Sequence, residues 1–213
     1  RVLFRSEIQY ENFNAADAIF EIQGVNVHPG SAKDVMVNAA LVAMEINAAL
    51  PCGETPADTE DYEGFYHLVS MSGDVACAKL HYIVRDHDAD KFAARLETLK
   101  EISKQMNLKW GFGTVKLTID EQYRNMAEII EDGNMHLIEN AKKACAAADV
   151  TPLILPIRGG TDGARLSFMG LPCPNLGTGG HGYHGPFEHI TAEGMDKAVD
   201  VMIELVKLYA EMK

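Results

Sequence analysis

Apolar and polar residues alternate in four segments of the first 120 residues, and two longer segments repeat apolar residues at helical spacing. In residues 19–27, for example, apolar Phe20 and Ile22 flank polar Glu21. A period of two predicts a half-buried strand, and a period near 3.6 predicts an amphipathic helix. The other predicted elements are strands at residues 64–70, 75–84 and 114–120 and helices at residues 34–50 and 89–106.

The predicted order in this region is strand, helix, strand, strand, helix, strand. That order is typical of a ferredoxin-like α+β sandwich. We therefore expect a four-stranded antiparallel sheet with both helices on one face. The pattern ends near residue 120, so we place this domain over residues 17–120, with residues 1–16 as a preceding connection.

Residues 121–213 follow a different pattern. Predicted helices alternate with short apolar strands, which is typical of part of an α/β layer with a parallel sheet. Two strands make a poor sheet, so we expect this second domain, residues 121–213, to be incomplete. Its elements are helices at residues 134–148, 164–169 and 192–212 and strands at residues 152–157 and 172–176.

The composition of the 213 residues is that of a soluble globular protein, with 47% apolar and 23% charged residues. The formal net charge of -12 would repel a phosphate backbone, so nucleic acid is excluded as a partner. No apolar run approaches the roughly 20 residues that span a bilayer, which argues against a membrane. The chain has neither a secretory signal nor an initiating Met, and we expect it to begin inside a longer protein.

The four cysteines are scattered and form no Cys-x-x-Cys pair, so a cysteine zinc site is not expected. A chain of this length needs no disulfide staples. Free thiols in a reducing cytoplasm are the simpler interpretation. These cysteines are Cys52, Cys77, Cys145 and Cys173.

Two segments that follow predicted strands contain groups capable of chemistry. Residues 177–185 combine five glycines with His181 and His184, and open α/β sheets bind ligands at the carboxyl ends of their strands. Arg158, which precedes two glycines, could hold a carboxylate with two hydrogen bonds. Thr161 and Asp162 could either cap the next helix or support that site. A serine nucleophile has no support, because Gly-x-Ser-x-Gly is absent.

Two further residues lie at predicted strand ends. His28 would project from the end of the first strand on the rigid turn Pro29-Gly30, and on these residues alone a simple turn histidine is the slightly favoured interpretation. Arg85 follows the third strand and would ordinarily be an exposed cation beside Asp86.

Several segments together resemble the M20 family of metallopeptidases, and within it the tripeptide aminopeptidases. The resemblance covers nearly all of residues 7–213, in the order and spacing of the family, whereas residues 1–6 do not match. The matching segments include Asn26-Val27-His28-Pro29-Gly30, Tyr62-Glu63-Gly64-Phe65-Tyr66-His67-Leu68, residues 10–16, 35–39, 81–86, 156–164 and 166–176, and Tyr183-His184-Gly185.

The resemblance implies an architecture and a set of roles. Residues 17–120 would be a ferredoxin-like lid, and residues 121–213 the C-terminal part of a zinc-exopeptidase α/β catalytic domain. His184 would be a metal ligand, and His28 would donate to the oxyanion that forms on the scissile carbonyl. Arg85 and Arg158 would bind the substrate carboxylate, and Asn38 is a weaker substrate-binding candidate.

The family uses two zinc ions and a glutamate base. In this chain only His184 matches a ligand, and no Glu-Glu dipeptide occurs, so the resemblance implies that the remaining ligands lie upstream of residue 1. The chain taken alone is then expected to lack activity.

The resemblance thus implies a zinc-dependent aminopeptidase that releases the N-terminal residue of tripeptides. Another M20 activity, either a dipeptidase or an N-acyl amino acid hydrolase, is the nearest alternative. A non-catalytic lid-type module for dimerisation or binding is the alternative from a different class. The expected partners are a small peptide substrate and a second copy of the chain, bound through the lid, and the expected location is cytoplasmic.

Overall fold

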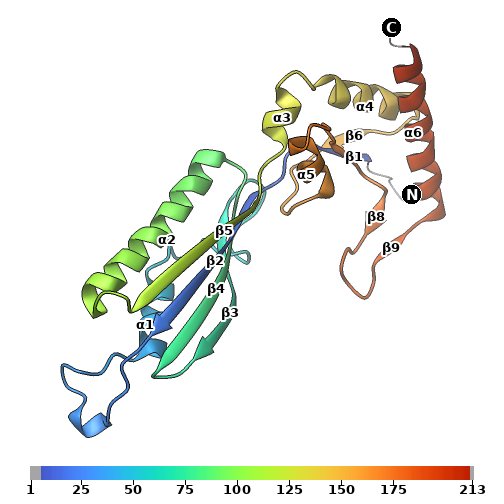
Figure 1. The fold of residues 1–213 in the computed structure, drawn as a ribbon. Coiled ribbons are helices and arrows are strands. Elements are labelled where there is room, and N and C mark those ends of the chain that lie inside the picture. Colours follow the sequence, from blue (N-terminus) through green and yellow to red (C-terminus); the bar gives the residue numbers. More distant parts are fainter. Residues whose placement is uncertain (1–5, 212–213) are drawn as a thin grey trace. The chain divides into compact units, whose positions relative to one another are not determined.

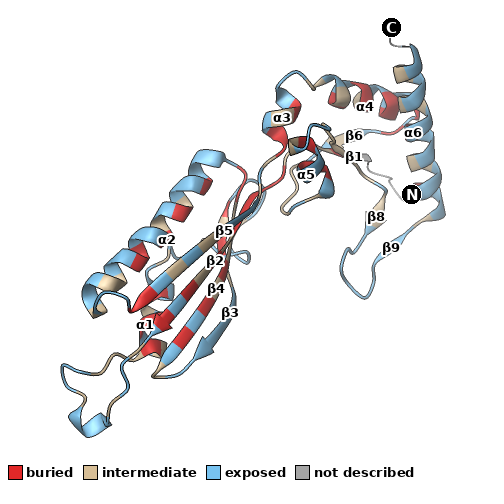
Figure 2. Ribbon diagram, viewed as in Figure 1, coloured by how far each residue is buried: buried red, intermediate tan, exposed pale blue. Residues whose placement is uncertain are grey.

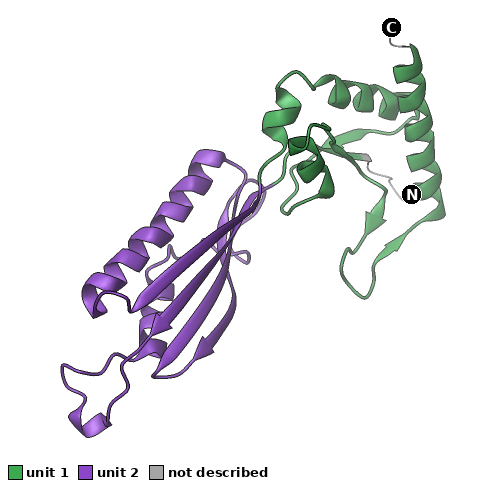
Figure 3. Cartoon of the chain, viewed as in Figure 1, with its two compact units in different colours: residues 1–12, 124–213 green, residues 13–123 purple. Residues whose placement is uncertain are grey.

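A computed structural model describes residues 6–211 of the chain and divides it into two compact units. One unit comprises residues 1–12 and 124–213, and the other comprises Phe13–Tyr123 (Figure 3). Residues 1–5, for which the sequence shows no resemblance, lie outside the described part. Among the described residues no helix is both long and apolar enough to cross a membrane.

The unit Phe13–Tyr123 is built on a four-stranded antiparallel sheet with the order β3-β4-β2-β5 (Figure 1). Two helices and a 3₁₀ turn complete it. Its elements are β2 (Asn14–Gln23), η1 (Pro29–Ser31), α1 (Ala39–Ala48), β3 (Phe65–Gly73), β4 (Cys77–Asp86), α2 (Ala89–Trp110) and β5 (Val115–Tyr123).

Both helices cover the same face of this sheet. Alternate residues of β2, such as Phe20, are fully buried in one apolar cluster that also contains Ile46 of α1 and Leu99 of α2. Glu21, between Phe20 and Ile22 on β2, is exposed. Buried positions thus alternate with less buried ones along this strand (Figure 2). The strand order and the one-sided helices confirm the predicted ferredoxin-like sandwich.

The first strand ends earlier than its alternation predicted. β2 stops at Gln23, and the apolar Val25 lies outside the sheet. Gly24 is the reason, because a Cβ there would lie 2.3 Å from the carbonyl oxygen of Val75, so the backbones touch where the chain leaves the strand. The prediction of a strand through residue 27 is therefore wrong.

The first helix also begins later than predicted, at Ala39 rather than residue 34. Asp34 adopts φ of 60°, which breaks helical geometry, and Asn38 caps the helix instead. Residues 34–38, which the apolar spacing assigned to the helix, instead form a loop that leads into the N-cap Asn38.

The second unit holds a three-stranded sheet with the order β6-β1-β7. β1 (Ser6–Gln9) pairs in parallel with β6 (Pro152–Ile154) and antiparallel with β7 (Asn175–Leu176). The predicted parallel pairing is present between β1 and β6, but the sheet is mixed because β7 pairs antiparallel with β1, a strand that the sequence pattern did not predict. Ile8 of β1 is fully buried.

Four helices and a short hairpin complete this unit. α4 and α6 pack with the sheet around one apolar cluster, which includes Ile138 and Val201. The mixed α/β class agrees with the prediction. The elements are α3 (Ala127–Glu131), α4 (His136–Ala147), α5 (Asp162–Phe168), β8 (Gly180–His181), β9 (His189–Ile190) and α6 (Ala192–Glu211).

Candidate functional site

The five residues selected from the sequence divide between the two units. His28, Asn38 and Arg85 belong to Phe13–Tyr123, whereas Arg158 and His184 belong to the other unit.

His28 lies on a protruding segment, residues 24–38, which we call the histidine arm. It does not end a strand as predicted, but is the N-cap of the 3₁₀ turn Pro29–Ser31. Its side chain is exposed, and its Nδ1 accepts a hydrogen bond of 3.1 Å from the backbone N–H of Gly30. The imidazole thus lies against the turn with one nitrogen engaged.

The root of the histidine arm is fixed by backbone hydrogen bonds. Val25 and Val37 exchange a pair of bonds of 2.8 and 3.1 Å, which closes the arm like a hairpin. Ala39 N–H donates to the carbonyl of Val75 at 3.1 Å, and Gly24 N–H donates to Ala76 at 2.8 Å. The arm is therefore fixed by backbone hydrogen bonds to the β3–β4 connection of its own unit.

Asn38 closes the arm and starts α1. Its side-chain oxygen accepts hydrogen bonds from the backbone N–H groups of Ala40 and Leu41, at 3.1 and 3.3 Å. These bonds satisfy two of the orphan donors at the helix N-terminus. A capping role is enough to explain asparagine here, and substrate binding by Asn38 stays a prediction.

Arg85 is the penultimate residue of β4, and its side chain contacts residues of its own unit. Its Nη1 donates to the carbonyl oxygens of Val84 and Ala16, and its guanidinium lies 5.3 Å from the ring centroid of Tyr123. Partial burial lowers the pKa of Arg85, while Tyr123 and the carboxylate of Asp17 oppose that shift. Arg85 is thus a partly buried, positioned cation rather than the freely exposed one that the sequence suggested.

Arg158 follows a strand-like bridge in which Ile157 N–H donates to the carbonyl of Glu11 at 2.8 Å. The next helix, α5, is capped by Thr161, whose hydroxyl accepts from Ala164 N–H at 3.1 Å. Of the two candidate caps in the sequence, Thr161 has the role, and Asp162 begins the helix. Arg158 is therefore placed at the junction between a bridged segment and a capped helix.

His184 lies in the turn of the β8–β9 hairpin, so the glycine-rich segment of residues 177–185 includes the short strand β8. Its backbone has φ of 60°, and its N–H donates to the Glu188 carboxylate at 3.0 Å. His181 and His189 face one another across the hairpin, with stacked rings 5.3 Å apart. The structure brings these two histidines together, and the approach of His184 to Arg158 stays a prediction.

A metal-binding cluster is not present among the described residues, since no group of three or more His, Cys, Asp or Glu side chains could hold an ion. A catalytic zinc takes about three protein ligands besides water. His184 therefore does not form such a site with the described residues alone.

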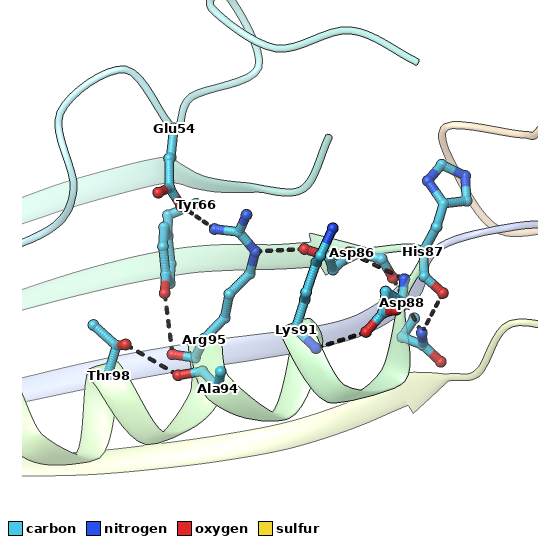
Figure 4. Close-up of polar contacts among 10 residues, drawn as sticks. Glu54, Tyr66, Asp86, His87, Asp88, Lys91, Ala94, Arg95 and Thr98 are labelled. Atoms are coloured by element: carbon cyan, nitrogen blue, oxygen red, sulfur yellow. Dashed lines mark hydrogen bonds and ion pairs between the residues drawn. The ribbon is translucent and has the colours of Figure 1, made fainter. Parts of the chain in front are cut away.

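The unit Phe13–Tyr123 also contains a network of charged groups that was not predicted from the sequence. Arg95 of α2 donates from Nε to Asp86 at 2.8 Å and from Nη1 to Glu54, and it lies 5.1 Å from the ring of Tyr66 (Figure 4). Gly64 passes so close that a Cβ would lie 2.2 Å from the Asp86 carboxylate. The network ties the acidic loop that contains Glu54 to the second helix.

Comparison with known sequences gives the family context. Residues 10–111 match the peptidase dimerisation domain of the M20 family. Peptidase T of Desulfitobacterium hafniense strain DCB-2 is 53% identical over 205 residues, which are 96% of this chain and 50% of that protein. Peptidase T of Clostridium perfringens strain ATCC 13124 is 52% identical with the same coverage. The chain spans about half the length of the curated relatives it matches.

Solved structures share the fold. The aminopeptidase PepT from Bacillus cereus superposes with a TM-score of 0.82 at 22% identity, over 96% of this chain and 54% of that one. A tripeptidase from Staphylococcus aureus gives the same TM-score at 16% identity, over 97% and 54% of the two chains. At these identities the likeness establishes the fold alone.

Proposed function

We propose that the chain belongs to the M20 peptidase family as a relative of peptidase T, and that the whole protein is an aminopeptidase releasing the N-terminal residue of tripeptides. The observation that carries this proposal is the identity of about half of all aligned residues over 96% of the chain. We also propose a cytoplasmic location, because the four cysteines are free thiols, as suits a reducing compartment.

We propose roles for the selected residues on the same basis. His28 donates a hydrogen bond to the substrate carbonyl oxygen as negative charge develops on it. Arg158 binds the substrate carboxylate, which its planar guanidinium suits, and Arg85 assists from the lid. These assignments rest on the M20 resemblance together with the exposed imidazole of His28 and the positioned guanidinium of Arg85.

Zinc is the metal that we propose for the complete protein, where it would supply a Lewis acid and an activated water. One relative in fold, YXEP of Bacillus subtilis, is described as a dinuclear metal-binding peptidase of the M20 family. We propose that His184 contributes one ligand and that the other ligands come from a part of the protein outside this chain. The described residues of this chain do not fit a zinc site by themselves.

A panel of substrates tests the proposed activity. The full-length protein, loaded with zinc, is assayed with dipeptides, tripeptides, tetrapeptides and N-acyl amino acids of matched side chains. Tripeptides are expected to give the highest kcat/KM, with free N-terminal residue as the first product. A preference for dipeptides or N-acyl amino acids would replace the proposal with another M20 activity, and no hydrolysis of any substrate would favour a binding module.

Substitution of Arg158 tests the proposed carboxylate contact. Arg158→Ala in the full-length enzyme is expected to raise KM for tripeptides roughly 10- to 100-fold with little change in kcat, because a ground-state ionic hydrogen bond is lost. A tripeptide with an amidated C-terminus is the control, and its KM should be the same for wild type and variant. Equal effects on both substrates would remove Arg158 from this role.

A homodimer formed through the lid is the proposed assembly, since residues 10–111 match a peptidase dimerisation domain. β3 is an edge strand of the sheet, with Val69 and Met71 exposed on it. Unpaired edges pair readily with another strand, and lysine on an edge opposes this.

Val69→Lys with Met71→Lys is expected to convert a dimer to a monomer in sedimentation. Leu108→Lys, an exposed site on α2, is the control, and a dimer that survives the β3 changes would place the interface elsewhere.

A further inference from the structure

The hydrogen bond between Gly30 and His28 has a consequence for the proton on the imidazole. A backbone N–H can only donate, so the Nδ1 atom that accepts from it must present a lone pair. In the neutral imidazole the single proton is then on Nε2. We infer that the Gly30 backbone selects the Nε2–H tautomer of His28, and thereby makes Nε2 a hydrogen-bond donor toward substrate.

The turn that presents this donor is held independently of the imidazole. Ser31 N–H donates to the carbonyl of His28 at 2.8 Å, and Ala32 N–H donates to the carbonyl of Pro29 at 3.3 Å. Pro29 fixes its own φ near the value that the first residue of a turn requires. Because the Ser31 bond closes the turn over Pro29 and Gly30, the Gly30 N–H is already aimed when the ring lies against it.

Glycine at position 30 also leaves the space that the ring occupies. A Cβ at this position would lie 3.2 Å from both Cε1 and Nδ1 of His28, which is closer than ordinary contact. A side chain there would require the imidazole to shift by a few tenths of an ångström. The same residue supplies the N–H and the room for the ring, and Gly30 is a positioning residue for His28.

The tautomer decides what His28 can stabilise. An oxygen that gains negative charge is stabilised by a donor and repelled by a lone pair. With Nδ1 held as an acceptor, the exposed imidazole offers N–H at Nε2 to a carbonyl oxygen without first exchanging its proton. This inference rests on the proposed function for its purpose, and on the Gly30 contact alone for the tautomer.

The tautomer can be read directly by NMR. The full-length protein is labelled with ¹⁵N at histidine, and long-range ¹H–¹⁵N spectra are recorded about two pH units above the ordinary histidine pKa of about 6.5. Signals lost in His28→Ala assign the ring. The expected result is a pyridine-type shift at Nδ1 and a pyrrole-type shift at Nε2. A pyrrole-type Nδ1 in the wild type would overturn the inference.

Two proline variants separate the Gly30 bond from the turn as a whole. Gly30→Pro removes the donor and is expected to shift the tautomer ratio toward the Nδ1–H form by roughly two- to tenfold, as for one net hydrogen bond. Ala32→Pro removes a different N–H of the same turn and should leave the ratio unchanged. An equal shift in both variants, or none in Gly30→Pro, would overturn the inference.

Activity is a separate readout. If the spectra show Nε2–H but His28→Ala retains full turnover, the proposed catalytic role fails and the tautomer assignment stands. If His28→Ala loses turnover while the wild-type spectra show Nδ1–H, the proposed catalytic role stands and the tautomer assignment fails.

Discussion

Replacing His28 with alanine in the full-length enzyme is expected to lower kcat by about 100- to 1,000-fold, the usual loss for one oxyanion donor. The imidazole is exposed, and its Nδ1 accepts a hydrogen bond from the Gly30 N–H within the same turn. Removing it takes nothing from either apolar core. The loss should therefore appear in turnover, with an unchanged melting temperature and an unchanged metal content by mass spectrometry.

A second histidine of the lid provides the matched control. His67 is exposed on β3, and His67→Ala should leave kcat within the error of the wild type. His28→Gln retains a donor near the position of Nε2, and is expected to recover part of the rate. A variant His28→Ala with normal turnover and a lowered melting temperature would show that this histidine serves the turn instead.

The lid could be predicted from the sequence because its pattern is local and regular. Phe20 and Ile22 alternate with Glu21, and each strand is long enough to show the period. The ends could not be predicted in the same way. β2 stops where Gly24 meets Val75, which are distant in the sequence, and no local pattern contains that contact.

In the other unit, contacts between residues distant in the sequence decide even which strands form. β1 has four residues, and its place between β6 and β7 depends on partners more than 140 residues away along the chain. β7 and β8 have two residues each, too few to display alternation. The candidate residues Arg158 and His184 were found from glycine-rich composition, while their hairpin and bridge surroundings needed the structure.

The charged network in the lid left a signal in the sequence that was not used. Asp86 continues the alternation of Leu80, Tyr82 and Val84, and so takes a buried position in β4. Arg95 lies between Phe92 and the other apolar residues of the buried face of α2. A carboxylate and a guanidinium at core-facing positions of adjacent elements predict a buried ion pair, because neither charge is found inside a protein unpaired.

Arg95→Leu is expected to destabilise the lid by about 3–5 kcal/mol, because it leaves a buried carboxylate without its cation. The side chain of Asp86 is 1% exposed and that of Arg95 is 14% exposed, so water does not replace the lost partner. Burial lowers the pKa of Arg95, but its hydrogen bonds to Asp86 and Glu54 raise the pKa by more than burial lowers it. The net shift is upward, as expected for a cation that its surroundings keep charged. The Glu54 side chain is 40% exposed, so its ion pair with Arg95 should contribute much less to the stability of the unit than the Asp86 pair does.

Hydrogen exchange of the β2–β4 amides is the suitable measurement, since it reports the lid separately from the other unit. Lys104→Leu is the control, because its pair with Glu101 lies on the surface of the same helix and should contribute no more than about 1 kcal/mol. The double variant Arg95→Leu with Asp86→Leu removes both charges, and should recover part of the loss even though the Asp88 N–H also loses its acceptor. If Arg95→Leu were as mild as Lys104→Leu, the pair would be dispensable. The close approach of Gly64 to Asp86 would then be the contact that holds the end of β4 in place.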